Sequence, residues 1–392
     1  MIDFELGQEL EALRDRVRDF VREVAIPAEA RDHSEHGLDA GLRAELQTAA
    51  KEWGIFGPQL PRDLGGLGLD LRGSSVILEE AGYSVLGPPA LNCAAPDEGN
   101  MHMLGLIATP AQRERYLVPL AAGEIRSCFS MTEPAPGAGS DPSMLRTSAE
   151  RVDGGWSING RKWFITGAEG ASFTICMAIA EGSATMFLVD AENPGYRVER
   201  TIEATDRAFT GGHGEVVFED CRVDEDAVLG AVGEGFAYAQ VRLAPARLTH
   251  CMRWLGTARR ALDIALDYAN EREAFGSKLG ELGMIQRFIA ESVIDIESSR
   301  TLIQRCAWVL DQGGNGRHES SVAKAHVAEA VVRVVDRSVQ ICGALGVSGD
   351  APLARLMNEV RPFRIYDGST ETHLWSIARR TLRARASDVS EV

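Results

Sequence analysis

The sequence lacks the cysteine and histidine spacings that mark disulfide frameworks and metal sites. Its 392 residues include seven cysteines, which are scattered along the chain without a Cys-x-x-Cys pair. An odd number of cysteines with no framework indicates free thiols in a reducing compartment. The eight histidines show no metal-ligand spacing. We therefore expect a cytoplasmic protein without a metal centre.

Long apolar runs and an excess of positive charge are also missing. No apolar run approaches the length of a membrane span. Residues 1–5 lack the basic and apolar regions of a secretory signal, so neither a span nor a signal is predicted. The chain has 41 Lys and Arg against 57 Asp and Glu, a net charge of -16. Such an acidic protein is a poor candidate for binding nucleic acid or anionic membrane surfaces.

What is present is a large hydrophobic fraction, arranged in three successive patterns. At 45% hydrophobic content, the chain is long enough for two or three domains. Leu10, Leu13 and Val17 recur at helical spacing, whereas residues 127 to 235 read as short strands and turns. Long apolar-striped helices follow. We predict an α+β protein with an all-α N-terminal domain (1–126), a middle antiparallel β-barrel domain (127–238) and a C-terminal four-helix bundle (239–392).

Two local signals in these segments have simple interpretations. Asn159-Gly160, within residues 156–163, is typical of a two-residue hairpin turn. The glycine-rich segment 61–69 lacks the spacing and the lysine of a phosphate-binding P-loop, so it is predicted to be a plain loop.

Several short motifs carry the chemical signal, although each has a purely structural alternative. Residues 131–134 (Met-Thr-Glu-Pro) and 139–141 (Gly-Ser-Asp) form a Pro- and Gly-rich turn that can aim backbone N–H groups at a planar or anionic ligand. Residues 161–168 (Arg-Lys-Trp-Phe-Ile-Thr-Gly-Ala) bring aromatic rings that would equally fill a core. Asp367 lies between an aromatic ring and a glycine in 366–373 (Tyr-Asp-Gly-Ser-Thr-Glu-Thr-His), where it would also suit a helix cap.

Together with residues 272–276 (Arg-Glu-Ala-Phe-Gly) and 340–346 (Gln-Ile-Cys-Gly-Ala-Leu-Gly), these motifs resemble the acyl-CoA dehydrogenase family of flavoproteins. The resemblance covers nearly the whole chain, and it is to the branch with Asp in the catalytic-base position. It implies an acyl-CoA dehydrogenase-like fold and an FAD-dependent oxidoreductase of fatty acid or lipid metabolism. The implied reaction is α,β-dehydrogenation of an acyl-CoA thioester to a trans-2-enoyl-CoA. Asp367 would remove the α-proton, and the flavin would accept hydride.

The same resemblance assigns contacts to the cofactor. Residues at the flavin edge and near the base would be Phe129, Met131, Thr132, Phe164, Ile165, Thr166, Ser369 and Glu371. Four others would reach the FAD of a neighbouring subunit: Arg272, Phe275, Gln340 and Gly343. Because successive strand residues face opposite ways, Trp163 and Phe164 are not expected to stack on the flavin together.

For the substrate, the implied contacts are Ser140, Arg247, Gly368 and Arg379. Some members take the base from the helix near Arg247, but residues 243–247 contain no acid, which leaves Asp367. Asp is one methylene shorter than the Glu of most members, so substrate or backbone must lie closer. Ala135-Pro136 is an insertion relative to many members and lengthens the loop over the site.

The partners implied are an acyl-CoA, an electron-transfer flavoprotein as electron acceptor, and further copies of the chain in a dimer or tetramer. Two other functions remain open. One is a nitroalkane oxidase-like or N-hydroxylating flavoenzyme of the same fold, and the other is a non-catalytic scaffold relative. The length, branching and ring system of the acyl group depend on pocket depth, on which the motifs carry no information.

Overall fold

The computed structural model describes residues 5–32, 34 and 36–390, and its chain divides into two compact units. The helical unit comprises residues 1–29, 69–88 and 247–392, and the sheet unit comprises residues 30–68 and 89–246. Each is described by itself. Helical, strand-rich and helical segments follow one another along the chain, in the predicted order. The three domain boundaries given above remain a prediction.

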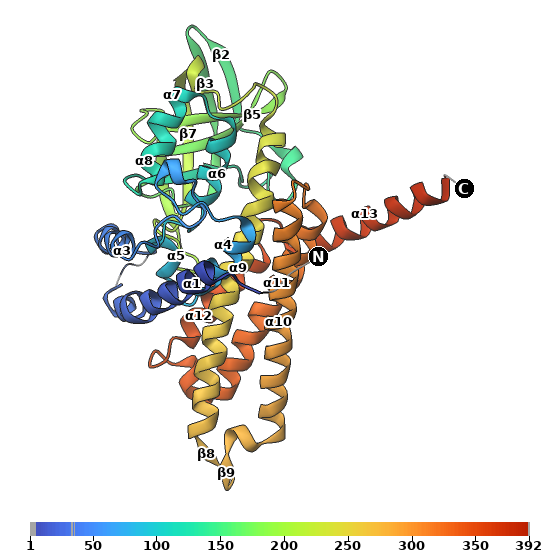
Figure 1. Ribbon diagram of the computed structural model, residues 1–392. Coiled ribbons are helices and arrows are strands. Elements are labelled where there is room, and N and C mark those ends of the chain that lie inside the picture. Colours follow the sequence, from blue (N-terminus) through green and yellow to red (C-terminus); the bar gives the residue numbers. More distant parts are fainter. Residues whose placement is uncertain (1–4, 33, 35, 391–392) are drawn as a thin grey trace. The chain divides into compact units, whose positions relative to one another are not determined.

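The helical unit is built from long helices with apolar stripes. α10 (Gly283–Asp311) packs on α11 (Arg317–Cys342), and α11 packs on α12 (Leu353–Val360) and α13 (Thr370–Ser390). α4 (Leu71–Ala81) contacts both α10 and α1 (Gln8–Phe20). In α11 the buried Val327, Val331 and Val334 recur at helical spacing, which is why this helix lies within the bundle. α13 has 21 residues, and its C-terminal part extends beyond the neighbouring helices (Figure 1).

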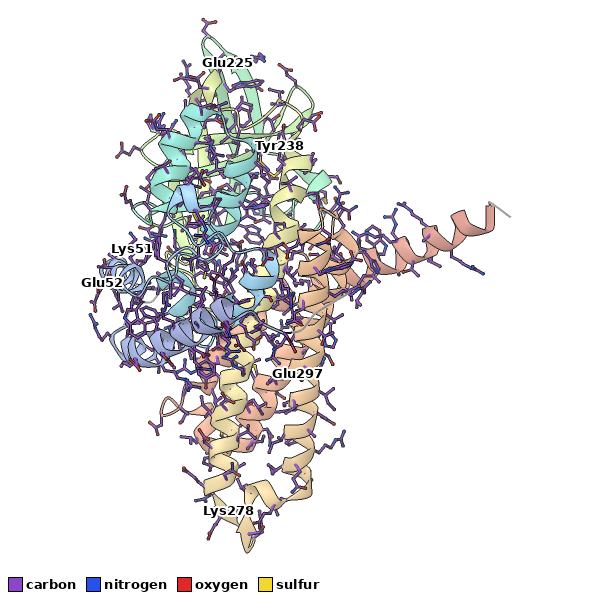
Figure 2. All side chains as sticks on the ribbon, viewed as in Figure 1. Lys51, Glu52, Glu225, Tyr238, Lys278 and Glu297 are labelled. Carbon is purple, nitrogen blue, oxygen red and sulfur yellow. The ribbon has the colours of Figure 1, made fainter. Side chains whose placement is uncertain are left out.

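Charged groups join α9 (Gly235–Glu271) to its neighbours within this unit. Arg259 pairs with Glu79 and Glu80 of α4, and Arg300 of α10 also pairs with Glu79. By contrast, Glu297 on α10 and Lys278 on β9 (Ser277–Lys278) are exposed at the surface of the unit (Figure 2).

The sheet unit is centred on a seven-stranded sheet. Its strands are β1 (Ser127–Ser130), β2 (Ser148–Val152), β3 (Gly155–Thr166), β4 (Phe173–Ala180), β5 (Ser183–Asp190), β6 (Tyr196–Ile202) and β7 (His213–Asp224). The order is β1-β4-β2-β3-β7-β6, with β5 also paired to β4. Most pairs are antiparallel, but β4 runs parallel to β1 and to β2.

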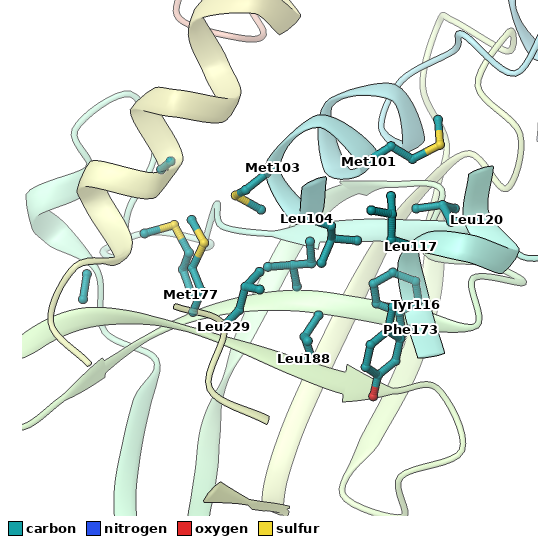
Figure 3. Close-up of a cluster of buried hydrophobic side chains, with 14 of the residues drawn as sticks. Met101, Met103, Leu104, Tyr116, Leu117, Leu120, Phe173, Met177, Leu188 and Leu229 are labelled. Atoms are coloured by element: carbon teal, nitrogen blue, oxygen red, sulfur yellow. The ribbon is translucent and has the colours of Figure 1, made fainter. Parts of the chain in front are cut away.

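Two apolar clusters hold this sheet. One, centred on Trp156, Phe187 and Phe218, is formed mainly by strand residues. The other packs helices on the sheet, among them α6 (Asp97–Ile107) and α8 (Val118–Ala121). Figure 3 shows this second cluster, in which Met101 and Leu104 of α6 share a core with Phe173 of β4.

The predicted hairpin turn at Asn159-Gly160 is wrong. Both residues lie inside β3, where the pairing with β7 shifts register between Ile158 and Gly160, a β-bulge. Gly160 is needed there because a Cβ would come within 2.4 Å of Thr147 Oγ1. The turn that joins β2 to β3 is at Asp153-Gly154, with Gly154 at a φ of +82°. Residues 61–69 form the predicted loop, around a short 3₁₀ turn at Arg62–Leu64.

Among the described residues, we find no helix that combines the length and apolarity of a membrane span. Within the same residues, no group of three or more His, Cys, Asp or Glu is arranged to hold a metal ion. All seven cysteines are buried free thiols, as expected. Residues 1–4, on which much of the prediction about a secretory signal depends, lie outside the described residues.

Candidate active site

Asp367 occupies a sharp reversal of the chain just before α13. Its φ is +55° and that of Gly368 is +91°. Aspartate is one of the few residues with a side chain that adopt this left-handed conformation readily. At Gly368, a Cβ would lie 2.8 Å from His373 Nε2. The backbone therefore turns here because the sequence supplies two residues suited to positive φ in succession.

The reversal is held by hydrogen bonds to the backbone oxygen of Asp367. Arg247 Nε donates to it over 2.9 Å, and His373 Nε2 lies 3.1 Å from it. A carbonyl oxygen only accepts, so the His373 proton is on Nε2. Burial lowers the pKa of His373 to about 4, which leaves the ring neutral at neutral pH. The backbone conformation of Asp367 is thus restrained by residues of two helices, α9 and α13.

A buried lysine ties the two sides of the same loop together. Lys324 of α11 is fully buried, and its Nζ donates to the backbone oxygens of Phe363 (2.6 Å) and Gly368 (2.9 Å). Burial lowers the pKa of Lys324 to about 8. Its two acceptors flank Tyr366 and Asp367, so Lys324 restrains the segment that carries the carboxylate.

The Asp367 carboxylate itself lies among aromatic side chains. Its Oδ2 is 3.5 Å from His250 Nε2, and its side chain is 18% exposed. The ring of His250 is 5.0 Å from that of Tyr366, centroid to centroid, and Trp254 Nε1 donates to the Tyr366 hydroxyl over 2.5 Å. A carboxylate that is largely desolvated yet reachable is chemically suited to accept a proton.

Of the residues predicted around the base, Arg247, Gly368, Ser369 and Glu371 lie on or against this loop. Arg247 contacts Asp367 directly, and Ser369 caps the start of α13 by accepting from Thr372 N over 3.3 Å. Arg379 lies more than two turns into α13, exposed and stacked on Trp375, with 4.4 Å between its Cζ and the ring centroid. Three residues that contact Asp367 or Gly368 were not predicted from the sequence: His250, Lys324 and His373. Lys324 lies among small and apolar residues of α11, and a lysine in such a segment could have indicated a buried, hydrogen-bonded ammonium.

The other group of predicted residues lies in the sheet unit, on β1, β3 and the loop between β1 and β2. Thr132 Oγ1 donates to Trp163 O over 2.7 Å, and Trp163 N donates to Thr132 O over 3.1 Å. These bonds bring residues 129–132 beside 163–166. Phe129, Met131, Thr132 and Thr166 are partly buried there, whereas Ile165 is buried in the strand core. Only the backbone of Ile165 is therefore available to a ligand.

Trp163 and Phe164 do not follow the expected alternation. The pairing of β3 with β7 shifts register between Lys162 and Ile165, and Phe164 has a φ of +50°. This second irregularity interrupts the strand period. The two rings consequently touch edge to face, 5.1 Å apart at an angle of 72°. Phe164 remains 48% exposed, a large apolar surface.

A buried ion pair anchors the loop that begins at Met131. Lys162 Nζ lies 2.9 Å from Glu133 Oε1, and both side chains are almost completely buried. Glu133 also accepts from the N–H and hydroxyl of Thr147 (2.8 and 2.6 Å) and from the N–H groups of Arg146 (2.8 Å) and Ala138 (3.2 Å). Burial alone would raise the pKa of Glu133, but the Lys162 charge and the Thr147 bonds lower it to about 2. The carboxylate stays ionised, and its hydrogen bonds join Glu133 to Ala138, Arg146 and Thr147, which follow it along the chain.

Ala135-Pro136, the predicted insertion, makes none of the contacts of Glu133 described above. Both residues are exposed, in a turn closed by Gly137 N donating to Pro134 O over 2.8 Å. These two residues therefore form part of an exposed turn, apart from the hydrogen bonds that Glu133 accepts. Ser140, the predicted thioester contact, is exposed farther along the same loop.

The four residues predicted to reach a neighbouring subunit are all exposed in the helical unit. Arg272 precedes β8 (Glu273–Ala274), and Phe275 lies at the tip of the β8–β9 hairpin with 94% of its surface exposed. Gln340 lies in the last turn of α11 and Gly343 just after it, at a φ of +58°. Nothing lies within 4 Å of the position of a Cβ on Gly343, so backbone can be approached closely there.

Comparisons with known proteins show the family of the chain. The N-terminal, middle and C-terminal domain families of acyl-CoA dehydrogenases match residues 7–124, 128–221 and 233–382. The probable acyl-CoA dehydrogenase FadE2 of Mycobacterium tuberculosis is 39% identical over 405 residues, covering 98% of each chain. Acyl-CoA dehydrogenase family member 11 of Gallus gallus is 36% identical over 93% of this chain but only 49% of its own, so the chain spans about half of that relative.

The fold comparison leads to the same family. The structure of butyryl-CoA dehydrogenase from Megasphaera elsdenii is similar with a TM-score of 0.87 and 29% identity, covering 97% of this chain and 100% of that one. The predicted fold class, helical at both ends with a β-rich middle, is confirmed. The chain belongs to the acyl-CoA dehydrogenase family.

Proposed function

We propose that the protein carries out FAD-dependent α,β-dehydrogenation of an acyl-CoA thioester to a trans-2-enoyl-CoA, with Asp367 as the base. Family membership supports the reaction type. The observation that carries the assignment of the base is the restrained loop. Arg247 and His373 bond the backbone oxygen of Asp367 itself, and Lys324 bonds that of the next residue.

The residues present fit FAD. The half-exposed Phe164 ring and the Thr132 and Thr166 side chains offer an uncharged surface for a flat ring system. In the helical unit, the exposed Arg272 offers a guanidinium fork suited to a pyrophosphate. FAD, when bound, supplies the hydride acceptor.

In the proposed mechanism, Asp367 removes the proton from the carbon next to the thioester carbonyl and becomes a carboxylic acid. The backbone N–H of Asp367 donates to the thioester oxygen and stabilises the charge that develops there. Such stabilisation requires donors that do not have to reorganise. The bonds from Arg247, His373 and Lys324 supply that rigidity.

For the substrate, we propose contacts with Ser140, Arg247, Gly368 and Arg379. The exposure of Arg379 suits a group that meets the polar CoA moiety, and Ser140, also exposed, is proposed to lie by the thioester. Gly368 and Arg247 adjoin the base. Electrons would leave to an electron-transfer flavoprotein. We also propose a role in fatty acid or lipid metabolism and a cytoplasmic location, the latter on the ground of seven buried free thiols.

The proposed reaction is tested by anaerobic titration of the purified protein with a panel of CoA esters of varied length, branching and ring content. At least one ester is expected to abolish the visible flavin absorbance and to yield its trans-2-enoyl product. Peroxide formation from a nitroalkane or hydroxylation of an amine, without response to any CoA ester, would instead identify one of the alternative flavoenzymes. A colourless protein that binds no flavin would identify a scaffold relative.

We further propose a homo-oligomer, a tetramer of two dimers, in which the hairpin carrying Arg272 and Phe275 meets the FAD of a neighbouring subunit. An apolar ring that is 94% exposed at a hairpin tip supports such a contact. FAD bound only by the assembled form stabilises that form by mass action. Arg272→Ala and Phe275→Ser are therefore expected to release FAD and dissociate the protein together, as measured by sedimentation followed at flavin and protein wavelengths. Lys278→Ala, on the same hairpin, is the control, and a monomer with full FAD content would contradict the proposal.

A further inference from the structure

Thr166 is the first member of a chain of three hydrogen-bonded side chains within the sheet unit. Its Oγ1 lies 3.0 Å from His213 Nδ1, and His213 Nε2 lies 3.0 Å from Asp206 Oδ2. Thr166 ends β3 and pairs with His213, which begins β7. Asp206 comes from the segment between β6 and β7. His213 and Asp206 are only 8% and 7% exposed, so water does not replace these partners.

The chemistry of the three groups restricts the directions that the two hydrogen bonds can take. An ionised carboxylate can only accept, so Nε2 of His213 carries the proton that is shared with Asp206. With the ring neutral, the other nitrogen, Nδ1, is an acceptor, and the Thr166 hydroxyl donates to it. With the ring protonated, both nitrogens would donate.

The histidine ring has little freedom to leave this orientation. The Phe209 ring lies 5.6 Å from it and the Phe164 ring 6.3 Å, centroid to centroid. Phe164 is also one of the residues proposed to meet the flavin. The hydrogen-bonded chain thus ends on a hydroxyl at the surface assigned to the cofactor.

We propose that Asp206 and His213 are positioning residues that hold the Thr166 hydroxyl as a hydrogen-bond acceptor toward the flavin, an inference that rests on the proposed function. The flavin nitrogen that receives hydride is an acceptor in the oxidised cofactor and an N–H donor in the reduced one. An oxygen lone pair turned toward it matches only the reduced form. The hydrogen-bonded side chains of Asp206, His213 and Thr166 therefore favour the reduced flavin, and none of them needs to contact the substrate for this effect.

Asp206→Asn tests the proposal with almost no change of shape. The introduced amide can donate to Nε2, which moves the imidazole proton to Nδ1. Nδ1 then donates to Thr166 Oγ1, and the hydroxyl proton turns outward. In the FAD-loaded protein, the equilibrium constant for flavin reduction against a reference dye is expected to fall roughly three- to tenfold, the range of one hydrogen bond.

Two further measurements separate this role from simple support of the fold. In a Thr166→Val background, Asp206→Asn is expected to leave the reduction equilibrium unchanged, because no hydroxyl remains to be turned. Nitrogen NMR of His213, assigned by its loss in His213→Asn, is expected to show the proton on Nε2 in the wild type and on Nδ1 in Asp206→Asn. This second readout needs neither turnover nor bound flavin.

The outcomes distinguish the inference from the function on which it rests. A flavoprotein in which Asp206→Asn switches the tautomer but leaves the reduction equilibrium unchanged would overturn the inference alone. The inference alone would also be overturned if Asp206→Asn changed the reduction equilibrium equally in the wild-type and Thr166→Val backgrounds. An unchanged His213 tautomer in Asp206→Asn would overturn it as well. A protein that binds no flavin and responds to no CoA ester would overturn the proposed function and the inference together.

Discussion

Asp367→Asn is expected to give a folded, flavin-loaded protein whose reduction by acyl-CoA is at least about a hundredfold slower than in the wild type. The amide occupies the same space as the carboxylate but cannot take up the α-proton. Asparagine tolerates positive φ as well as aspartate does, so the backbone at +55° is preserved. Rapid-mixing measurement of flavin absorbance under anaerobic conditions, with ligand affinity determined separately, gives the rate.

The chain offers a matched control for this substitution. Asp220 is also an aspartate at positive φ, +43°, but it is exposed on β7 of the sheet unit. Asp220→Asn is expected to reduce its flavin at the wild-type rate. Asp367→Glu should retain partial activity, because a carboxylate remains but is one methylene longer and less suited to positive φ. An Asp367→Asn variant with near wild-type reduction would show that the base lies elsewhere.

The sequence was sufficient to single out Asp367 as a candidate residue. It did not predict the side chains that surround Asp367 and restrain its backbone. The Tyr-Asp-Gly motif marks a carboxylate at a chain reversal, and Gly368 at a φ of +91° agrees with that pattern. Lys324 and His250 are distant from it along the chain and come from α11 and α9. Which faces of those helices meet the loop depends on the packing of the bundle. A single sequence contains the apolar stripe but not the rotation of one helix against another.

In the sheet unit, short apolar segments of the sequence predicted strands correctly, but the sequence did not predict the two irregularities within β3. Asn159-Gly160 has the composition of a tight turn, yet β3 pairs with β7 on both sides of it. The long-range pairing outweighs the local preference, and the same two residues become a bulge. The irregularity after Lys162 likewise puts Trp163 and Phe164 in contact, which strict alternation excludes. Neither feature follows from residue spacing, because each is imposed by a partner strand.

The ion pair of Glu133 and Lys162 illustrates a contact whose consequence can be measured. Both residues lie in motifs whose other members were predicted to contact the flavin, and no contact between the two was predicted. In the structure, Lys162 Nζ lies 2.9 Å from Glu133 Oε1. The pair closes the loop that carries Met131, Thr132 and Ser140. Its energetic value is asymmetric, because Glu133 has four other hydrogen-bond donors, from Thr147, Arg146 and Ala138. Without Glu133, the Lys162 ammonium would keep two uncharged acceptors, Met131 O at 3.1 Å and Met177 O at 2.7 Å, but no counter-charge.

Glu133→Ala is therefore expected to destabilise the sheet unit by about 3–5 kcal/mol, the usual cost of leaving a buried charge unpaired. Lys162→Met should cost less, since the carboxylate keeps its N–H and hydroxyl donors. The double variant should be more stable than Glu133→Ala alone, because it removes the unpaired ammonium. Thermal unfolding of the FAD-loaded proteins and proteolysis within residues 131–147 measure these effects. Arg161→Met is the control, because Arg161 lies on β3 like Lys162 but forms a more exposed ion pair, with Glu215 of β7. It should cost less than about 1 kcal/mol.

The pH dependence of stability provides an independent check on the charge of Glu133. Its pKa is about 2 in the folded protein, below the 4.5 of an unperturbed glutamate. A carboxylate with a depressed folded-state pKa contributes stability that is complete above about pH 4.5 and is lost as the pH falls toward 2. Glu133→Gln, which cannot ionise, should lose less stability than the wild type across that interval. Parallel acid-unfolding curves for the two proteins would mean that Glu133 is not the ionised partner of Lys162, and the expected ranking of Glu133→Ala and Lys162→Met would fail with it.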